Sequence, residues 1–113
     1  MKLNELEPHF ITYVENEDGI FHPHIDTLAE AHGIMFLCPV CFLKNDGPVG
    51  THSVICWFGG RVADSVTPGP GRWNPSGTNY DDFSFVGPGA ASILLNGDCN
   101  AHFFIKEGNI VFA

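Results

Sequence analysis

Two short motifs with the same internal spacing constrain the fold of this chain more than any other feature. Cys38 and Cys41 form the first, Cys-Pro-Val-Cys, and Cys99 and His102 form the second, Cys-Asn-Ala-His. Two intervening residues let both side chains of a pair point to adjacent corners of one tetrahedron, as in zinc knuckles. Three thiolates and one imidazole form a common structural zinc site, because soft sulfur ligands favour zinc over magnesium or calcium. We therefore expect zinc bound by Cys38, Cys41, Cys99 and His102.

Other interpretations of the same residues remain open. His52 lies on the same face of a predicted strand as Cys56, and it could replace His102 as the fourth ligand or line a site. Cys56 is expected in the core, where free cysteines often pack, and Cys38 and Cys99 could also be core residues only. A redox role for Cys38 and Cys41 is disfavoured, because no strand-to-helix junction that would lower a thiol pKa is predicted there.

Length and charge limit the class of protein. The chain has 113 residues, the size of one domain (1–113), with 13 acidic against five basic side chains. So few cations argue against a nucleic-acid-binding surface and against a polybasic membrane patch. The sequence has no apolar stretch that could span a bilayer and no secretion signal at its start. We therefore expect a cytoplasmic protein, in a compartment that keeps its thiols reduced.

Hydrophobic patterning predicts a mainly β fold with one short helix over residues 25–33, capped near Asp26 or Thr27 and ended by Gly33. The architecture that we expect is a small antiparallel fold, of two packed sheets or of β-tent type, clamped by zinc. Residues 1–9 are expected as a loose arm. An exposed last strand could pair with a second copy to give a homodimer. The predicted strands are 10–14, 34–38, 51–58 (apolar on both faces and therefore central), 83–86, 92–95, 102–105 and 109–113.

Residues 59–82 are rich in Gly and Pro, and so long a loop in a small domain is usually functional. Arg and Trp are enriched at interface hot spots, and Pro limits the entropy lost on docking. We expect the loop to bind a protein or a small ligand. An alternative is that Trp73 folds back to cover the core. The candidate binding residues are Arg72, Trp73, Tyr80, Asp81 and His52.

The ordered motifs MFLCPVC, THSVICWF, PGPGRWNPSGTNYDDFSF and CNAHFFIKEGNI resemble a family of small phage and prophage proteins that commonly carry the label "ammonia monooxygenase". The resemblance covers most of residues 33–112. It implies that the Cys-x-x-Cys and Cys-x-x-His pairs and the segments around Trp57 and Trp73 are shared, and that the protein acts in the host cytoplasm if it is phage-encoded. The label does not suit this chain, since that enzyme is a membrane copper assembly, whereas this sequence has neither a spanning segment nor a histidine-rich copper site.

Two knuckles that clamp a small antiparallel fold are also similar, at the level of fold, to the zinc β-tent domains. That class includes the cereblon ligand-binding domain and the zinc-containing methionine sulfoxide reductases. The similarity implies a fold but no activity.

The alternative function is a zinc- or thiol-dependent enzyme, either a hydrolase or similar to a sulfoxide reductase. If His102 is not a ligand, a three-thiolate site with an open position remains, and Asp81, Asp82 or His52 could act as its base. Cys56 is the one thiol outside the two motifs, but a thiol buried in apolar surroundings is a poor nucleophile. We therefore expect a binding domain with structural zinc rather than an enzyme.

Overall fold

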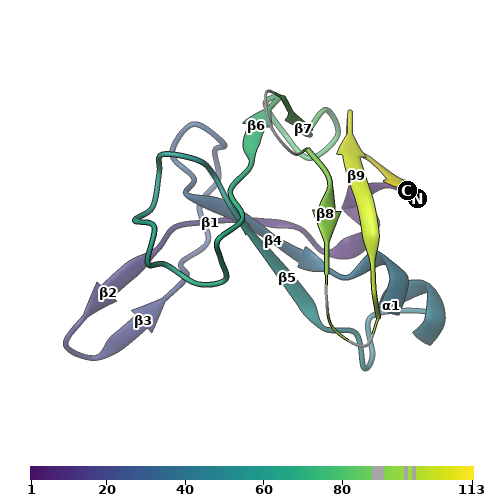
Figure 1. Cartoon of the computed structure of the whole chain (residues 1–113), viewed down its shortest axis with the longest axis horizontal. Coiled ribbons are helices and arrows are strands. Elements are labelled where there is room, and N and C mark those ends of the chain that lie inside the picture. Colours follow the sequence, from purple (N-terminus) through teal and green to yellow (C-terminus); the bar gives the residue numbers. More distant parts are fainter. Residues whose placement is uncertain (88–90, 96, 98) are drawn as a thin grey trace.

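The structure is a computed structural model of the whole chain, and it describes residues 1–87, 91–95, 97 and 99–113. Within these residues, short strands form four antiparallel sheets, and one α-helix follows β4 (Figure 1). The predicted mainly β fold with one short helix is confirmed. The described part of the chain contains no helix that is long and apolar enough to cross a membrane.

The elements follow one another in this order: η1 (Leu3–Leu6), β1 (His9–Ile11), β2 (Val14–Asn16), β3 (Gly19–Phe21), β4 (Gly33–Leu37), α1 (Pro39–Asn45), β5 (Ser53–Trp57), β6 (Asn74–Ser76), β7 (Ser84–Val86), β8 (Ile93–Leu94), β9 (His102–Lys106) and β10 (Asn109–Phe112).

The main core lies between two three-stranded sheets, ordered β1-β4-β5 and β10-β9-β8. Alternate residues of each strand point inward, so β4 contributes Ile34 and Phe36 while β9 contributes Phe103 and Ile105. The rings of Phe36 and Phe103 meet edge to face, with 6.1 Å between their centroids. This contact joins the two sheets, as the predicted pair of packed sheets requires.

The strand predicted as central, 51–58, is instead an edge strand in hydrogen-bonding order, and β4 is the middle strand. The prediction was wrong because apolar residues on both faces show only that both faces are covered. The second face of β1-β4-β5 is covered by the loop that follows β5. There, Val66 packs against Ile11 and Trp57, and the Trp57 indole N–H donates to the Thr67 carbonyl oxygen at 3.0 Å.

The predicted helix over 25–33 is a turn, and the α-helix lies over Pro39–Asn45. The segment is too short to be a stable helix by itself, and the backbone of β1 holds both of its ends. Ile25 N–H donates to the Phe10 carbonyl oxygen, and His32 N–H donates to that of Ile11. The sequence Cys-Pro-Val-Cys begins the actual helix, with Pro39 at its first position, where a missing N–H costs nothing.

Residues 1–9 are packed against the domain, so the predicted loose arm is also wrong. Leu3 and Leu6, spaced one turn apart in η1, are both fully buried. Leu3 N–H donates to the Gly108 carbonyl oxygen, and Ile110 N–H donates to that of Met1. Part of the free edge of β10 is thereby covered. Pairing of the last strand with a second copy stays a prediction.

We expect Gly33→Ala to destabilise the protein by about 1–3 kcal/mol, because the site has no room for a methyl group. A Cβ at Gly33 would lie 2.7 Å from Trp57 Cε3 and 2.8 Å from the Cys56 carbonyl oxygen. Gly87→Ala is the matched control, since a Cβ there meets no heavy atom of the described residues within 4 Å. Urea unfolding measures both variants, and equal stability of the two would contradict the packing described.

Candidate metal centre

Three cysteines and one histidine converge at one end of the molecule. The sulfur atoms of Cys38, Cys41 and Cys99 and one ring nitrogen of His52 all lie within 4.8 Å of one another. Cys38 Sγ is 4.0 Å from Cys99 Sγ, and Cys99 Sγ is 3.6 Å from His52 Nε2. Cys38 is buried and His52 is exposed, so this Cys3His cluster lies at the surface with one side in the core.

The pairing of β4 with β5 places His52 beside Cys38. Phe36 pairs with Val54 and Leu37 with Ser53, so the next pair in the same register is Cys38 with His52. The ladder does continue, because Cys38 N–H donates to the His52 carbonyl oxygen at 2.9 Å. Residues directly opposite in an antiparallel pair have side chains on the same face. The cluster therefore receives Cys38 and His52 from adjacent strand ends.

Both motifs fold as knuckles in their backbones. The Cys38 sulfur accepts hydrogen bonds from the N–H groups of Cys41 and Val40, and the Cys99 sulfur accepts one from Ala101 N–H. These bonds stabilise a thiolate, as hydrogen bonds to coordinating atoms commonly do in metal sites. The Ala101 N–H, with smaller help from His52, lowers the pKa of Cys99 to about 7. Burial acts the other way at Cys38 and raises its pKa to about 11.

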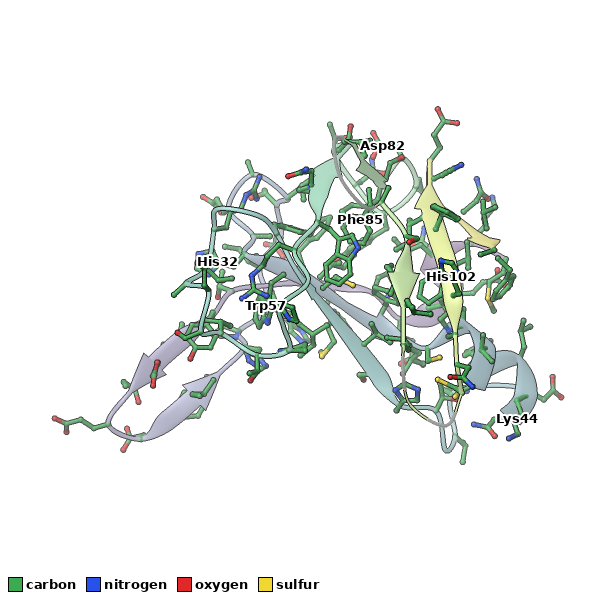
Figure 2. The ribbon with its side chains drawn as sticks, in the orientation of Figure 1. His32, Lys44, Trp57, Asp82, Phe85 and His102 are labelled. Atoms are coloured by element: carbon green, nitrogen blue, oxygen red, sulfur yellow. The ribbon has the colours of Figure 1, made fainter. Side chains whose placement is uncertain are left out.

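His102, predicted as the fourth ligand, is not in the cluster. It is the first residue of β9 (Figure 2), and the inward positions of that strand are Phe103 and Ile105. Strand alternation turns His102 to the outer face with Phe104, and their ring centroids are 6.1 Å apart. The Cys-Asn-Ala-His spacing thus contributes a thiol only. The alternative ligand weighed from the sequence, His52, occupies the fourth place.

The donor set fits a tetrahedral ion that prefers sulfur and nitrogen. Metal–sulfur bonds of about 2.3 Å and metal–nitrogen bonds of about 2.0–2.1 Å require S···S distances of about 3.8 Å and S···N distances of about 3.6 Å. The Cys38–Cys99 and Cys99–His52 distances, 4.0 and 3.6 Å, are close to these values. Since all four ligand atoms lie within 4.8 Å of one another, these side chains can hold one metal ion.

The sequence predicts no strand-to-helix junction at Cys38 and Cys41, but the structure has one. The pair does lie at a strand-to-helix junction, since β4 ends at Leu37 and Cys38 is the N-cap of α1. Yet burial raises the pKa of Cys38, whereas thiols that react in disulfide exchange have a lowered pKa. The geometry is that of a ligand pair.

Cys56, the thiol outside both motifs, is fully buried opposite Ile34 in the β4–β5 ladder. Burial strongly raises the pKa of its thiol. The expectation of a core residue is confirmed, and the chemistry of a thiol enzyme has no accessible nucleophile at this position.

Arg72 and Trp73, predicted to bind a partner, are both engaged within the protein. The Arg72 guanidinium donates to five backbone carbonyl oxygens between residues 63 and 71 and so holds this loop together. The Trp73 indole N–H donates to the Ser92 carbonyl oxygen at 3.0 Å, and its ring stacks on Phe85 with 5.8 Å between centroids. Trp73 thus covers the core, which was the alternative considered for it.

The other predicted binding residues have internal partners too. The Tyr80 hydroxyl accepts the Phe10 N–H at 2.9 Å, and the Asp81 carboxylate accepts a hydrogen bond from the Asn4 side chain. Asp82 accepts the N–H groups of Thr78 and Asn79, at 2.8 and 2.9 Å. Figure 2 shows Asp82 near β6 and β7, away from the end of the molecule where β4 meets α1. It is therefore not placed to act as a base at the metal.

Comparisons with protein-family models, with curated proteins and with solved structures found no match to this chain.

We expect His52→Ala to weaken zinc binding by at least about 100-fold, because it removes a direct ligand, and changes beyond the ligands already cost about 10–100-fold. His102→Ala is the matched control and should bind zinc like the unchanged protein. Competition with a colorimetric chelator measures both affinities. The opposite ranking would show that the second motif binds through its histidine after all.

Stability should depend on pH through Asp82, whose pKa is lowered by hydrogen bonds from the Asn79 and Thr78 N–H groups. A carboxylate whose pKa is lower in the folded chain adds stability at pH values above its unfolded pKa of about 3.9. That stability is lost as the pH falls through the lower pKa of the folded state. Asp82→Asn should therefore be less stable than the unchanged protein at pH 7, with a smaller difference at pH 3. Urea unfolding measures this, and Asp18→Asn in the β2–β3 turn is the control. An equal difference at both pH values would contradict it.

Proposed function

We propose that this chain is a small zinc-binding domain in which the metal is structural, and that it binds a protein or a small ligand through residues 59–82. The observation that carries the first part is the convergence of the Cys3His cluster from separate chain segments. Zinc suits three thiolates and an imidazole better than the hard cations do. Four protein ligands would fill a tetrahedral shell, the arrangement of structural sites, whereas catalytic sites keep one position for water.

The position of the cluster supports a structural role. Cys38 and Cys41 flank the start of α1, His52 precedes β5, and Cys99 precedes β9. A metal ion held by these residues would join the two three-stranded sheets at one end of the core. Because the ligands cannot gather in an unfolded chain, the free energy of metal binding adds to the free energy of folding.

A groove beside Arg61 supports binding through residues 59–82. Its volume is about 390 Å³, and its lining includes Arg61, Pro75, Ser76 and Thr78 from this segment, facing Leu28 from the 26–31 turn. Small-molecule sites typically measure about 300–1,000 Å³. Since Arg72, Trp73, Tyr80 and Asp81 bond within the protein, we assign binding to this groove rather than to those side chains.

We propose a phage-type origin and a cytoplasmic location for this domain. The ordered motif string supports placing the domain with the small phage and prophage proteins that it resembles. Use of three cysteines as metal ligands requires thiols kept reduced, which supports a cytoplasmic location, in the host if the chain is phage-encoded.

Removing the metal should unfold or strongly destabilise the protein. We expect the zinc-loaded form to contain one zinc per chain and its Tm to fall by roughly 10 °C or more after treatment with a chelator. Elemental analysis and thermal unfolding followed by circular dichroism measure the two quantities. Cys99→Ser is the matched control, and its Tm should respond little to chelator. A zinc-free protein with an unchanged Tm would overturn the structural role.

A further inference from the structure

The two arginines of this acidic chain make no ion pair with a carboxylate in the part of the chain that the structure describes, although acidic side chains outnumber basic ones by 13 to five. The Nη1 and Nη2 donors of Arg72 are used within its own loop, and its buried Nε has no hydrogen-bond partner among the described residues. Arg61 differs, because its side chain is exposed and lines the groove.

The Arg61 guanidinium is held in place from two sides. Its Nη1 donates to the carbonyl oxygens of Leu28 and Ala31, at 2.7 Å each, and its Cζ lies 5.3 Å from the centroid of the Phe58 ring. A guanidinium has five N–H donors, and both hydrogens of Nη1 are used here. Within the described residues, the N–H groups on Nη2 and Nε therefore remain as a fork, the geometry that binds a carboxylate through two parallel hydrogen bonds.

The walls of the Arg61 groove limit what can accompany such an anion. Leu28, Ala29 and Pro75 give it apolar surface, and Ser76 adds a hydroxyl. An apolar wall beside one fixed cation suits a ligand with a negatively charged group at one end and an apolar remainder.

Charge around the groove favours a single negative charge. Arg61 is the one cationic residue in its lining as described. Two carboxylates bond to residues that line the groove: Glu30 accepts from the Thr27 hydroxyl at 3.2 Å, and Asp82 accepts from the Thr78 hydroxyl at 2.9 Å. These acids would repel a phosphate dianion more strongly than a monocarboxylate.

We propose that the Arg61 groove binds a small monocarboxylate with an apolar body, the carboxylate on the Nη2–Nε edge of Arg61 and the body against Leu28, Ala29 and Pro75. This inference rests on the proposed binding through residues 59–82 and names the chemistry of the ligand.

The test uses N-acetyl-leucine as the probe, its neutral amide as the matched ligand control, and the zinc-loaded protein. Titration followed by two-dimensional ¹H–¹⁵N NMR should shift the signals of residues 27–31 and 75–78. Binding should be at least about 10-fold tighter for the acid than for the amide, because the charge-assisted bonds are lost in the amide.

Variants separate the contributions. Arg61→Gln should abolish the preference for the acid, and Arg61→Lys should weaken binding, since the charge remains without the fork. Because Arg61 also supports the 26–31 turn, Ala29→Leu is added. It leaves Arg61 intact, fills the groove, and should weaken binding about 10-fold. Lys106→Gln, which removes a charge on β9, should bind as the unchanged protein does.

Each other outcome overturns the inference. Equal binding of acid and amide in the groove would refute the carboxylate preference while leaving ligand binding through 59–82 intact. No shift with either probe, or unchanged binding in Ala29→Leu, would refute the groove as the site. Equal shifts with inorganic phosphate would show a general anion site. The structural role of zinc is judged separately by chelation.

Discussion

The antiparallel register between β4 and β5 is the constraint on which most of this structure depends. A slip of one residue would turn every side chain of one strand to the opposite face. In the observed register Gly33 lies opposite Trp57, leaving space for the indole, and Ile34 lies opposite Cys56 in the core. At the other end of the same ladder, His52 lies opposite Cys38. One pairing therefore determines both the packing of the largest fully buried side chain, Trp57, and the histidine of the candidate metal cluster.

Much of the fold could be predicted, because alternating apolar residues mark strands wherever one face is buried. The strands at 34–38, 102–105 and 109–113 fall within one or two residues of their predicted positions. The misplaced helix has a physical cause. The pattern of 25–33 is helical, but its backbone groups bond to β1 and Arg61 instead, and such long-range partners leave no trace in local sequence.

The three cysteines of the candidate metal site could be predicted from the sequence, but its histidine could not. Cysteine spacing identifies Cys38, Cys41 and Cys99 because a knuckle is a local structure. The fourth ligand depends on which strands pair and in what register, and this is not local information. A signal did exist, since His52, Val54 and Cys56 share a strand face, and His102 shares one with Phe104 rather than with Phe103. If the strands on either side of Cys-Pro-Val-Cys pair with each other, this alternation of faces places His52, rather than His102, beside the cysteines.

The arrangement of the ligands has a mechanical consequence. Cys38 and His52 lie at the adjacent ends of β4 and β5, and Cys41 lies in α1, which directly follows β4, whereas Cys99 alone comes from the segment between β8 and β9. A metal bound by the first three would stiffen one layer only. An ion bound by all four residues would therefore restrain the separation of the two layers through one bond only, the one to the Cys99 thiolate, in addition to the packing of the core.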